Sequence, residues 1–220
     1  MLANNPFIKI TSTGKEQVVD RVKEKVELQI LLNNAITRGG LIVVEGQPGI
    51  GKSTLVNLIL KDLQRSRKIK VINEEFTPVS YNKLRSINLE PPLKTVLILD
   101  DFNNIEMLDK KSQRSVVDVT YELSQKIAVI IIDNRTDGVS NELKNSKRYF
   151  ERFHLYGLQR SDLRQLIIDR LNEARSVPTE NMDPFTEDEY DKIYKKSGGN
   201  PRIALLICSA LFDQKESSII

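Results

Sequence analysis

The sequence predicts an α/β fold in which a doubly wound parallel sheet of five strands is followed by a small helical lid. Runs of consecutive apolar residues at 41–44, 96–99 and 127–132 show no polar alternation, which is typical of parallel strands covered on both faces. Segments with helical periodicity separate these runs, as the crossovers of a parallel sheet require. From Ser161 onward the periodicity is helical throughout.

The first half of the predicted core alternates helices and strands around a glycine-rich loop. A long amphipathic helix at 16–35 ends before Gly39 and feeds into the strand at 41–44. The apolar positions of this helix are Val18, Val19, Val22, Val26, Ile30 and Leu31. A second helical stripe follows the loop, at Leu55, Ile59, Leu60 and Leu63. A short strand at 69–72 comes next.

The second half of the core repeats this alternation. A short helix near 81–87 stops before a pair of prolines, and the buried strand at 96–99 follows. A helix at 116–123 leads to the strand at 127–132, and residues 153–155 make the last, short strand.

The C-terminal part carries helical signals alone. Helical stretches at 163–171, 187–195 and 201–212 form the predicted lid. We therefore expect a core that spans residues 1–158 and a lid that spans residues 159–220.

The composition is that of a globular protein of ordinary size. The chain has 220 residues, 40% of them hydrophobic, with a formal net charge of +3. No apolar run approaches a membrane span, and we expect a soluble, cytoplasmic protein. The one cysteine, Cys208, lies in an apolar helical pattern and is expected to be a core residue. A packed structural role is likewise expected for the one histidine, His154.

The loop between the first strand and the second helix matches the pattern G-x-x-x-x-G-K-[ST]. Its residues are Gly46, Gln47, Pro48, Gly49, Ile50, Gly51, Lys52 and Ser53, and Thr54 follows. Glycines allow the backbone N–H groups to point inward, and the helix N-terminus adds partial positive charge, so the loop can cradle phosphates. Lys52 would reach the β and γ phosphates, and the Ser53 hydroxyl would bind Mg²⁺. The flanking strand and helix favour this interpretation over a glycine-rich turn that binds nothing.

Two acids, Asp100 and Asp101, follow the buried strand at 96–99. In a parallel sheet this strand end lies beside the phosphate loop, where one carboxylate can hold the Mg²⁺ shell and its neighbour can polarise an attacking water. Paired acids also form turns, but the phosphate loop upstream favours the catalytic interpretation. The sequence therefore predicts binding and hydrolysis of ATP with Mg²⁺.

These motifs together resemble the AAA+ and STAND branch of the P-loop ATPases over nearly the whole chain. The resemblance rests on residues 46–54, the 95–101 strand, Asn134 after the next strand, and Gly198-Gly199-Asn200-Pro201-Arg202. Asn5-Pro6-Phe7 and Gly14-Lys15-Glu16 look like the adenine-side segment of initiators of the origin-recognition family. The chain thus resembles a minimal AAA+ ATPase of archaeal or viral type.

The resemblance implies roles for single residues. Asn134 would be the sensor that contacts the γ-phosphate or the attacking water, with a plain turn residue as the alternative. Arg202 would be the second sensor, on the lid. Arg148 is the preferred arginine finger donated to a neighbouring subunit, with Arg152 and Arg135 as alternatives; each could equally be a surface cation. A homo-oligomer assembled through the ATP site follows from this expectation.

Asp101 departs from the initiator pattern, which has Glu at this position. STAND ATPases commonly carry paired Asp, and Arg135 looks like their strand-end arginine. The resemblance implies an ATPase that couples ATP turnover to remodelling or loading on DNA or a protein–DNA assembly. The alternative is a STAND-like, nucleotide-dependent oligomerisation switch with little turnover. The absence of a winged helix or repeat domain after the lid counts against that branch.

DNA is a possible partner, because most small ATPases of this kind work with it. A basic run at Arg65, Arg67, Lys68 and Lys70 could neutralise phosphates. A solvated helix end is the alternative, since Asp62 and Glu74 bracket the run and no aromatic residue interrupts it.

Overall fold

The structure is a computed structural model that describes residues 5–8, 21–77, 83–84, 86–87, 94–135 and 141–217. The chain divides into two compact units. The larger unit holds Arg21–Pro48 and Lys52–Leu155, and the smaller holds Met1–Asp20, Gly49–Gly51 and Tyr156–Ile220.

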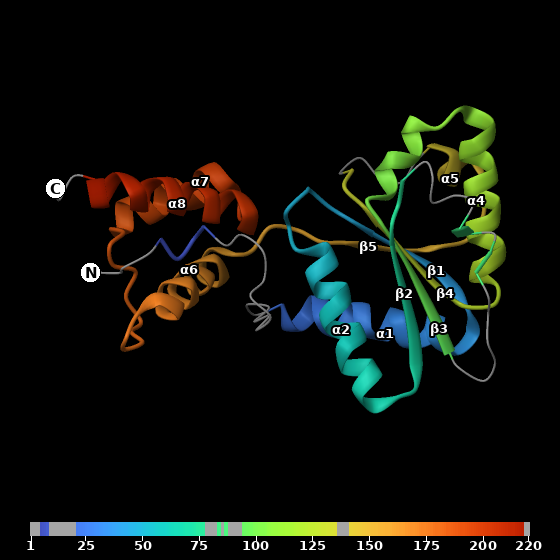
Figure 1. The fold of residues 1–220 in the computed structure, drawn as a ribbon, viewed down its shortest axis with the longest axis horizontal. Helices are drawn as coiled ribbons and strands as arrows, with labels where there is room; N and C mark the ends of the chain where they lie inside the picture. Colours follow the sequence, from blue (N-terminus) through green and yellow to red (C-terminus); the bar gives the residue numbers. More distant parts are fainter. Residues whose placement is uncertain are drawn as a thin grey trace. The chain divides into compact units, whose positions relative to one another are not determined.

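The larger unit is built on one parallel sheet (Figure 1). Its strands are β1 (Gly40–Glu45), β2 (Ile69–Glu75), β3 (Lys94–Asp100), β4 (Ala128–Asp133) and β5 (Glu151–His154). Their spatial order is β2-β3-β4-β1-β5, and every pairing is parallel. Helices cover both faces, which confirms the predicted doubly wound five-stranded sheet.

One face of the sheet is covered by α1 (Val22–Arg38) and α2 (Lys52–Ser66) (Figure 1). The other is covered by η1 (Phe102–Met107), α4 (Lys110–Ser124) and α5 (Asn141–Asn145). Alternate residues of β1, β3 and β4 point to each side and are almost fully buried. The short helices η1 and α5 were not predicted. The predicted helix near 81–87 lies largely outside the described residues.

The buried face of α1 differs from the predicted one. Leu28, Leu32, Ala35 and Ile36 are buried, whereas Val22, Val26 and Ile30 are 64%, 52% and 55% exposed. Both stripes have helical spacing, so periodicity alone does not distinguish them. Residues 9–20, which include the predicted start of this helix, lie outside the described part of the chain.

The smaller unit contains α6 (Arg160–Ala174), α7 (Glu187–Ser197) and α8 (Pro201–Ser217) around their own apolar core. Phe7 lies in this core, 5.7 Å from the ring of Phe185 and 6.3 Å from that of Phe212. Cys208 is fully buried there, as expected for a core residue. None of the helices in the described ranges is long and apolar enough to cross a membrane.

Backbone contacts in the smaller unit join the segment before α6 to the turn between α7 and α8. The Leu158 N–H donates a 2.8 Å hydrogen bond to the Gly199 carbonyl between α7 and α8. A Cβ on Gly199 would lie 2.3 Å from the Leu158 carbonyl oxygen, and one on Gly157 would lie 2.5 Å from that of Gly198. Only residues without a side chain fit at 157 and 199, because backbone cannot move aside as a flexible side chain can.

Candidate nucleotide site

The predicted site residues of the larger unit meet at one edge of the sheet. The phosphate loop follows β1, Asp100 ends β3, and Asn134 follows β4. These three strands are neighbours in the order β3-β4-β1, and all run in the same direction. Their carboxyl ends therefore form the edge at which open α/β sheets bind ligands.

The phosphate loop has the backbone that its glycines permit. Gly49 and Gly51 have φ of 79° and 102°, in the left-handed range that residues with side chains rarely adopt. The loop leads directly into the first residue of α2, so the N-terminal N–H groups of that helix face the loop. Ser53 is half-buried in this first turn, and Gln47, Pro48 and Thr54 are exposed.

Lys52 is buried and held within the loop. Its ammonium group donates to the carbonyls of Gly46 at 2.8 Å and Gln47 at 3.0 Å. It also donates to Oδ1 of Asn134 at 2.7 Å. An ammonium group has three N–H donors, so these contacts fix the lysine at the centre of the loop.

Asn134 connects Lys52 to the acid pair. While its Oδ1 accepts from Lys52, its Nδ2 donates to Oδ1 of Asp101 at 2.6 Å and to Oδ1 of Asn103 at 3.2 Å. The structure thus brings Lys52, Asn134 and Asp101 into one hydrogen-bonded line.

The two neighbouring acids, Asp100 and Asp101, make different hydrogen bonds. Asp100 ends β3, and its Oδ1 accepts the backbone N–H of Asp101 at 2.9 Å. Asp101 has left-handed backbone angles, φ 53° and ψ 39°, and its side chain turns toward Asn134. The two carboxylates therefore have different hydrogen-bond partners.

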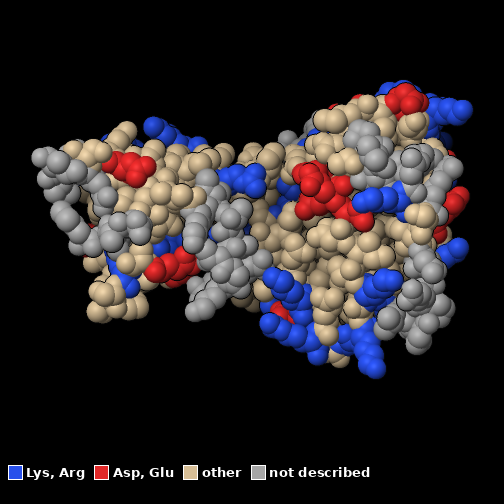
Figure 2. Space-filling model, in the orientation of Figure 1, with Lys and Arg blue, Asp and Glu red and all other residues tan. Residues whose placement is uncertain are grey.

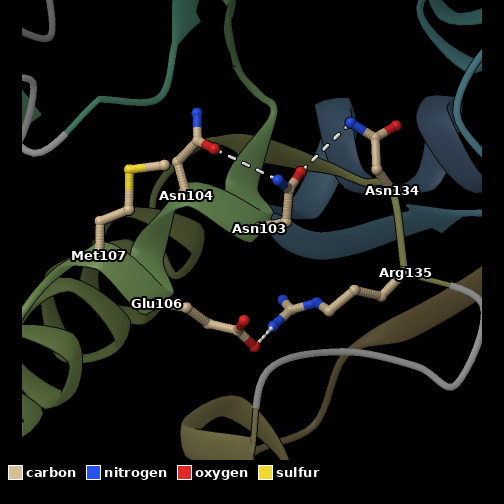
Figure 3. Close-up of a pocket in the computed structure, with 6 residues that line it drawn as sticks. All are labelled: Asn103, Asn104, Glu106, Met107, Asn134 and Arg135. Atoms are coloured by element: carbon tan, nitrogen blue, oxygen red, sulfur yellow. Dashed lines mark hydrogen bonds and ion pairs between the residues drawn. The ribbon is translucent and has the colours of Figure 1, made fainter.

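A cavity of about 440 Å³ opens beside this line (Figure 3). It is lined by Asn103, Asn104, Glu106, Met107, Asn134 and Arg135. Arg135, an alternative finger, is bound to its own chain through Asp133 and Glu106. Burial alone lowers the pKa of Arg135, but hydrogen bonds and charge from Asp133 and Glu106 outweigh this and raise it.

The other predicted finger residues also have partners within the chain. Arg148 Nη2 lies 2.8 Å from Oδ1 of Asp118, and its guanidinium stacks 4.6 Å from the ring centroid of Tyr121. Arg152 donates twice to Oε1 of Glu45, at 2.7 Å and 3.0 Å. All three arginines are therefore held by contacts within the chain.

Glu45, Asn103, Asn104 and Asp133 were not singled out in the sequence. Each is a polar residue at or just beyond the end of a strand that carries a motif, and that position was the available signal. His154 lies on the edge strand β5, with Nδ1 3.8 Å from Oε1 of Glu45.

Arg202 begins a helix of the smaller unit. Its N–H and that of Ile203 donate to Oδ1 of Asn200, at 3.1 Å and 3.3 Å, and Pro201 is the first residue of α8. Within the same unit, a Cβ on Gly49 would lie 2.6 Å from Cβ of Arg202.

The donor set fits a nucleotide that brings its own Mg²⁺. The described residues contain no group of three or more His, Cys, Asp or Glu side chains arranged for a metal. One hydroxyl, Ser53, and one carboxylate, Asp100, are what such a site supplies when phosphate oxygens and water complete the shell. Lys52 and the glycine backbone suit the polyphosphate.

Three known proteins show what the chain resembles. It is 32% identical over 97 residues to the DNA repair protein RadA of Helicobacter pylori. These 97 residues are 44% of this chain and 21% of the relative. A RuvB variant of Thermotoga maritima aligns with a TM-score of 0.58 and 23% identity, over 89% of this chain and 63% of that one. Orc1 of Aeropyrum pernix, solved in complex with DNA, aligns at 0.63 and 15%, over 90% and 61%.

The chain spans about a fifth of the RadA relative and less than two thirds of these two structures. At such identities the structural likeness concerns the fold, which is that of the AAA+ ATPases, as predicted. The family model described as bacterial TniB protein matches residues 9–163, well over half of the chain. The protein therefore belongs to the TniB family of P-loop ATPases.

Proposed function

We propose that this protein binds ATP with Mg²⁺ and hydrolyses it. The observation that carries the proposal is the hydrogen-bonded line from Lys52 through Asn134 to Asp101, which joins the phosphate loop to the strand-end acid. Lys52 and the loop N–H groups hold the phosphates, and Asp101 accepts the proton of the attacking water. Asn134 orients that water. Ser53 and Asp100 would hold the Mg²⁺ that accompanies the nucleotide, which would neutralise charge at the phosphates.

The test is steady-state phosphate release together with nucleotide binding. Lys52→Ala should abolish both, because the buried ammonium is the loop's phosphate ligand. Asp101→Asn should abolish release while ATP still binds. Lys61→Ala, an exposed lysine on the same helix, is the matched control and should turn over normally. Undetectable turnover in the intact protein, with and without DNA, would contradict the proposal.

We further propose that ATP drives assembly into a homo-oligomer. Arg202 contributes as the lid sensor, and Arg148 as the finger toward a neighbouring subunit. In the structure Arg148 is held by Asp118 and Tyr121 of its own chain, so assembly has to exchange that contact. This observation also favours the second candidate, a switch that assembles with ATP and turns over little. ATP-dependent sedimentation with negligible phosphate release would support the switch, and an unchanged monomer would contradict it.

DNA is the proposed partner. The RadA relative is named a DNA repair protein, and the Orc1 structure contains DNA. In this chain, four neighbouring strands each begin beside an exposed basic residue. In the order β2-β3-β4-β1 these residues are Lys68, Lys94, Lys126 and Arg38.

Contacts between the strand starts bring these residues to one edge. Ile69 of β2 pairs with Lys94 of β3, and Lys94 Nζ donates to the carbonyl of Thr37 at 3.4 Å. The Gly40 N–H donates to the carbonyl of Ile127 at 3.2 Å. Since neighbouring strands lie about 4.8 Å apart, the basic residues form a row along the amino-terminal edge of the sheet. Figure 2 shows Lys and Arg side chains gathered around the α2 side of this unit.

This basic row lies at the edge of the sheet opposite the nucleotide site, so DNA and ATP need not compete for the same surface. Its residues are Lys68, Lys94, Lys126 and Arg38. We expect a Lys94→Ala, Lys126→Ala double variant to bind labelled duplex DNA more weakly. The slope of log affinity against log salt is negative, and its magnitude should fall by about 2, because each phosphate contact contributes about 0.9. Lys23→Ala, an exposed lysine on α1, is the control. Unchanged affinity and slope in the double variant would exclude this edge.

A further inference from the structure

The side chains of three asparagines form a directed chain of hydrogen bonds beside the candidate nucleotide site (Figure 3). Asn134 Nδ2 donates to Oδ1 of Asn103 at 3.2 Å, and Asn103 Nδ2 donates to Oδ1 of Asn104 at 3.2 Å. Asn104 Nδ2 then donates to the carbonyl of Phe76 at 3.0 Å. We call Asn134, Asn103 and Asn104 the amide relay.

Both ends of the amide relay fix the direction of every amide in it. The Lys52 ammonium has donors but no acceptor, so Asn134 must turn its oxygen toward it. The Phe76 carbonyl is an acceptor, so Asn104 must turn its nitrogen toward it. Reversing the amide of Asn103 would place nitrogen against nitrogen at Asn134 and oxygen against oxygen at Asn104. One arrangement therefore satisfies all the groups.

The far end of the amide relay is anchored to the acid-bearing strand. The Phe76 N–H donates to the carbonyl of Asp100 at 2.7 Å, and the Asn104 N–H donates to the carbonyl of Asp101 at 3.0 Å. The relay thus begins at Lys52 and returns to the strand end that carries the proposed base. A displacement anywhere along it changes the position of Asn134 relative to Asp101.

We infer that Asn103 is a positioning residue for the ATPase reaction, an inference that rests on the proposed hydrolysis. An amide nitrogen has two N–H donors, and Asp101 and Asn103 accept from both donors of Asn134. Asn103 therefore fixes the rotation of the Asn134 amide, and through it the geometry between the phosphate loop and Asp101. Asn104 holds Asn103 in turn. Neither residue contacts Lys52 in the described hydrogen bonds, so nucleotide affinity does not depend on them.

The test separates turnover from binding. Asn103→Ala should lower kcat roughly ten-fold, less than the ~100-fold loss that a 1 Å misplacement can cause. The Kd for ATP should stay within about two-fold, because the loop contacts of Lys52 remain. Asn104→Ala should lower kcat in the same direction but less. Asn73→Ala, an exposed asparagine on β2, is the matched control and should change neither value.

A double variant shows whether Asn103 acts through Asn134. In an Asn134→Ala background, adding Asn103→Ala should cause no further loss of kcat. A full additional loss in that background, or unchanged kcat in the single variant, would overturn the inference. So would a weakening of ATP binding equal to the loss of kcat.

Thermal unfolding without nucleotide gives an independent measure. The fall in Tm of the double variant should be smaller than the sum for Asn103→Ala and Asn134→Ala, since each removes the same hydrogen bond. If the intact protein released no phosphate, the proposed hydrolysis and the positioning role would both fail. The Tm values would then show separately whether the amide relay exists, and additive shifts would exclude it.

Discussion

Asp101 combines an unusual backbone with a central place in the site. Its φ of 53° lies in the left-handed region, which Asp and Asn enter more readily than longer side chains because they hydrogen-bond locally. This gives a physical reason for the short acid at a position where the resembled initiators carry Glu. The departure noted in the sequence therefore coincides with a backbone requirement.

Replacing Asp101 by Asn and by Glu should separate charge from backbone. Asp101→Asn keeps a residue that tolerates the left-handed conformation, so its unfolding free energy should change little while phosphate release is lost. Asp101→Glu keeps the charge but should destabilise the protein by about 1 kcal/mol and still not exceed the original turnover. Urea unfolding and phosphate release measure the two effects. A more active and equally stable Glu variant would refute this explanation.

Helix α1 shows that an apolar pattern with helical spacing does not by itself predict which face of a helix is buried. It carries two stripes with helical spacing, one through Leu28 and Leu32 and one through Val22, Val26 and Ile30. Leucine side chains fill the space against the sheet, and the β-branched stripe remains exposed. The choice depends on which stripe the sheet can accommodate, which is a tertiary property.

The two stripes of α1 should respond differently to truncation. Leu32→Ala should lower the free energy of unfolding by about 3 kcal/mol, because it removes a fully buried side chain and leaves a cavity. Ile30→Ala, on the 55% exposed side, should cost less than about 1 kcal/mol. Denaturant unfolding of both variants is the measurement. Equal losses would show that the outer stripe is covered in solution.

The strands and the meeting of Lys52, Asn134 and Asp101 could be predicted, because parallel strands place their carboxyl ends on one edge. The pairing of Arg148 with Asp118 could not, since it depends on how α4 packs against α5 and the segment that follows it. The basic row at the amino-terminal edge of the sheet could not be predicted from the sequence either. Lys94 and Lys126 stand far apart in the sequence, and sheet order alone makes them neighbours.

At the scale of the whole molecule, the smaller unit should be the part most sensitive to alkali. Burial raises the pKa of the Cys208 thiol from 9.0 to about 12, and burial raises that of Tyr190 from 10.0 to about 12. The unfolded chain loses these protons first, so folded stability is full below about pH 9 and falls as pH rises toward 12. Urea unfolding at pH 8 and pH 10.5 should show this loss. The loss of unfolding free energy should be smaller in Cys208→Ala than in the original protein. An equal loss in the two proteins would show that Cys208 does not cause the effect.

The contact between Leu158 and Gly199 has a consequence for how the smaller unit opens. It ties the segment just before α6 to the turn between α7 and α8, so α6 separates from the other two helices only when this hydrogen bond breaks. The three helices also share one apolar core, so opening any of them exposes buried side chains of the others. The helices should consequently exchange their amide hydrogens as one cooperative block, with the Leu158 amide as the reporter of the whole.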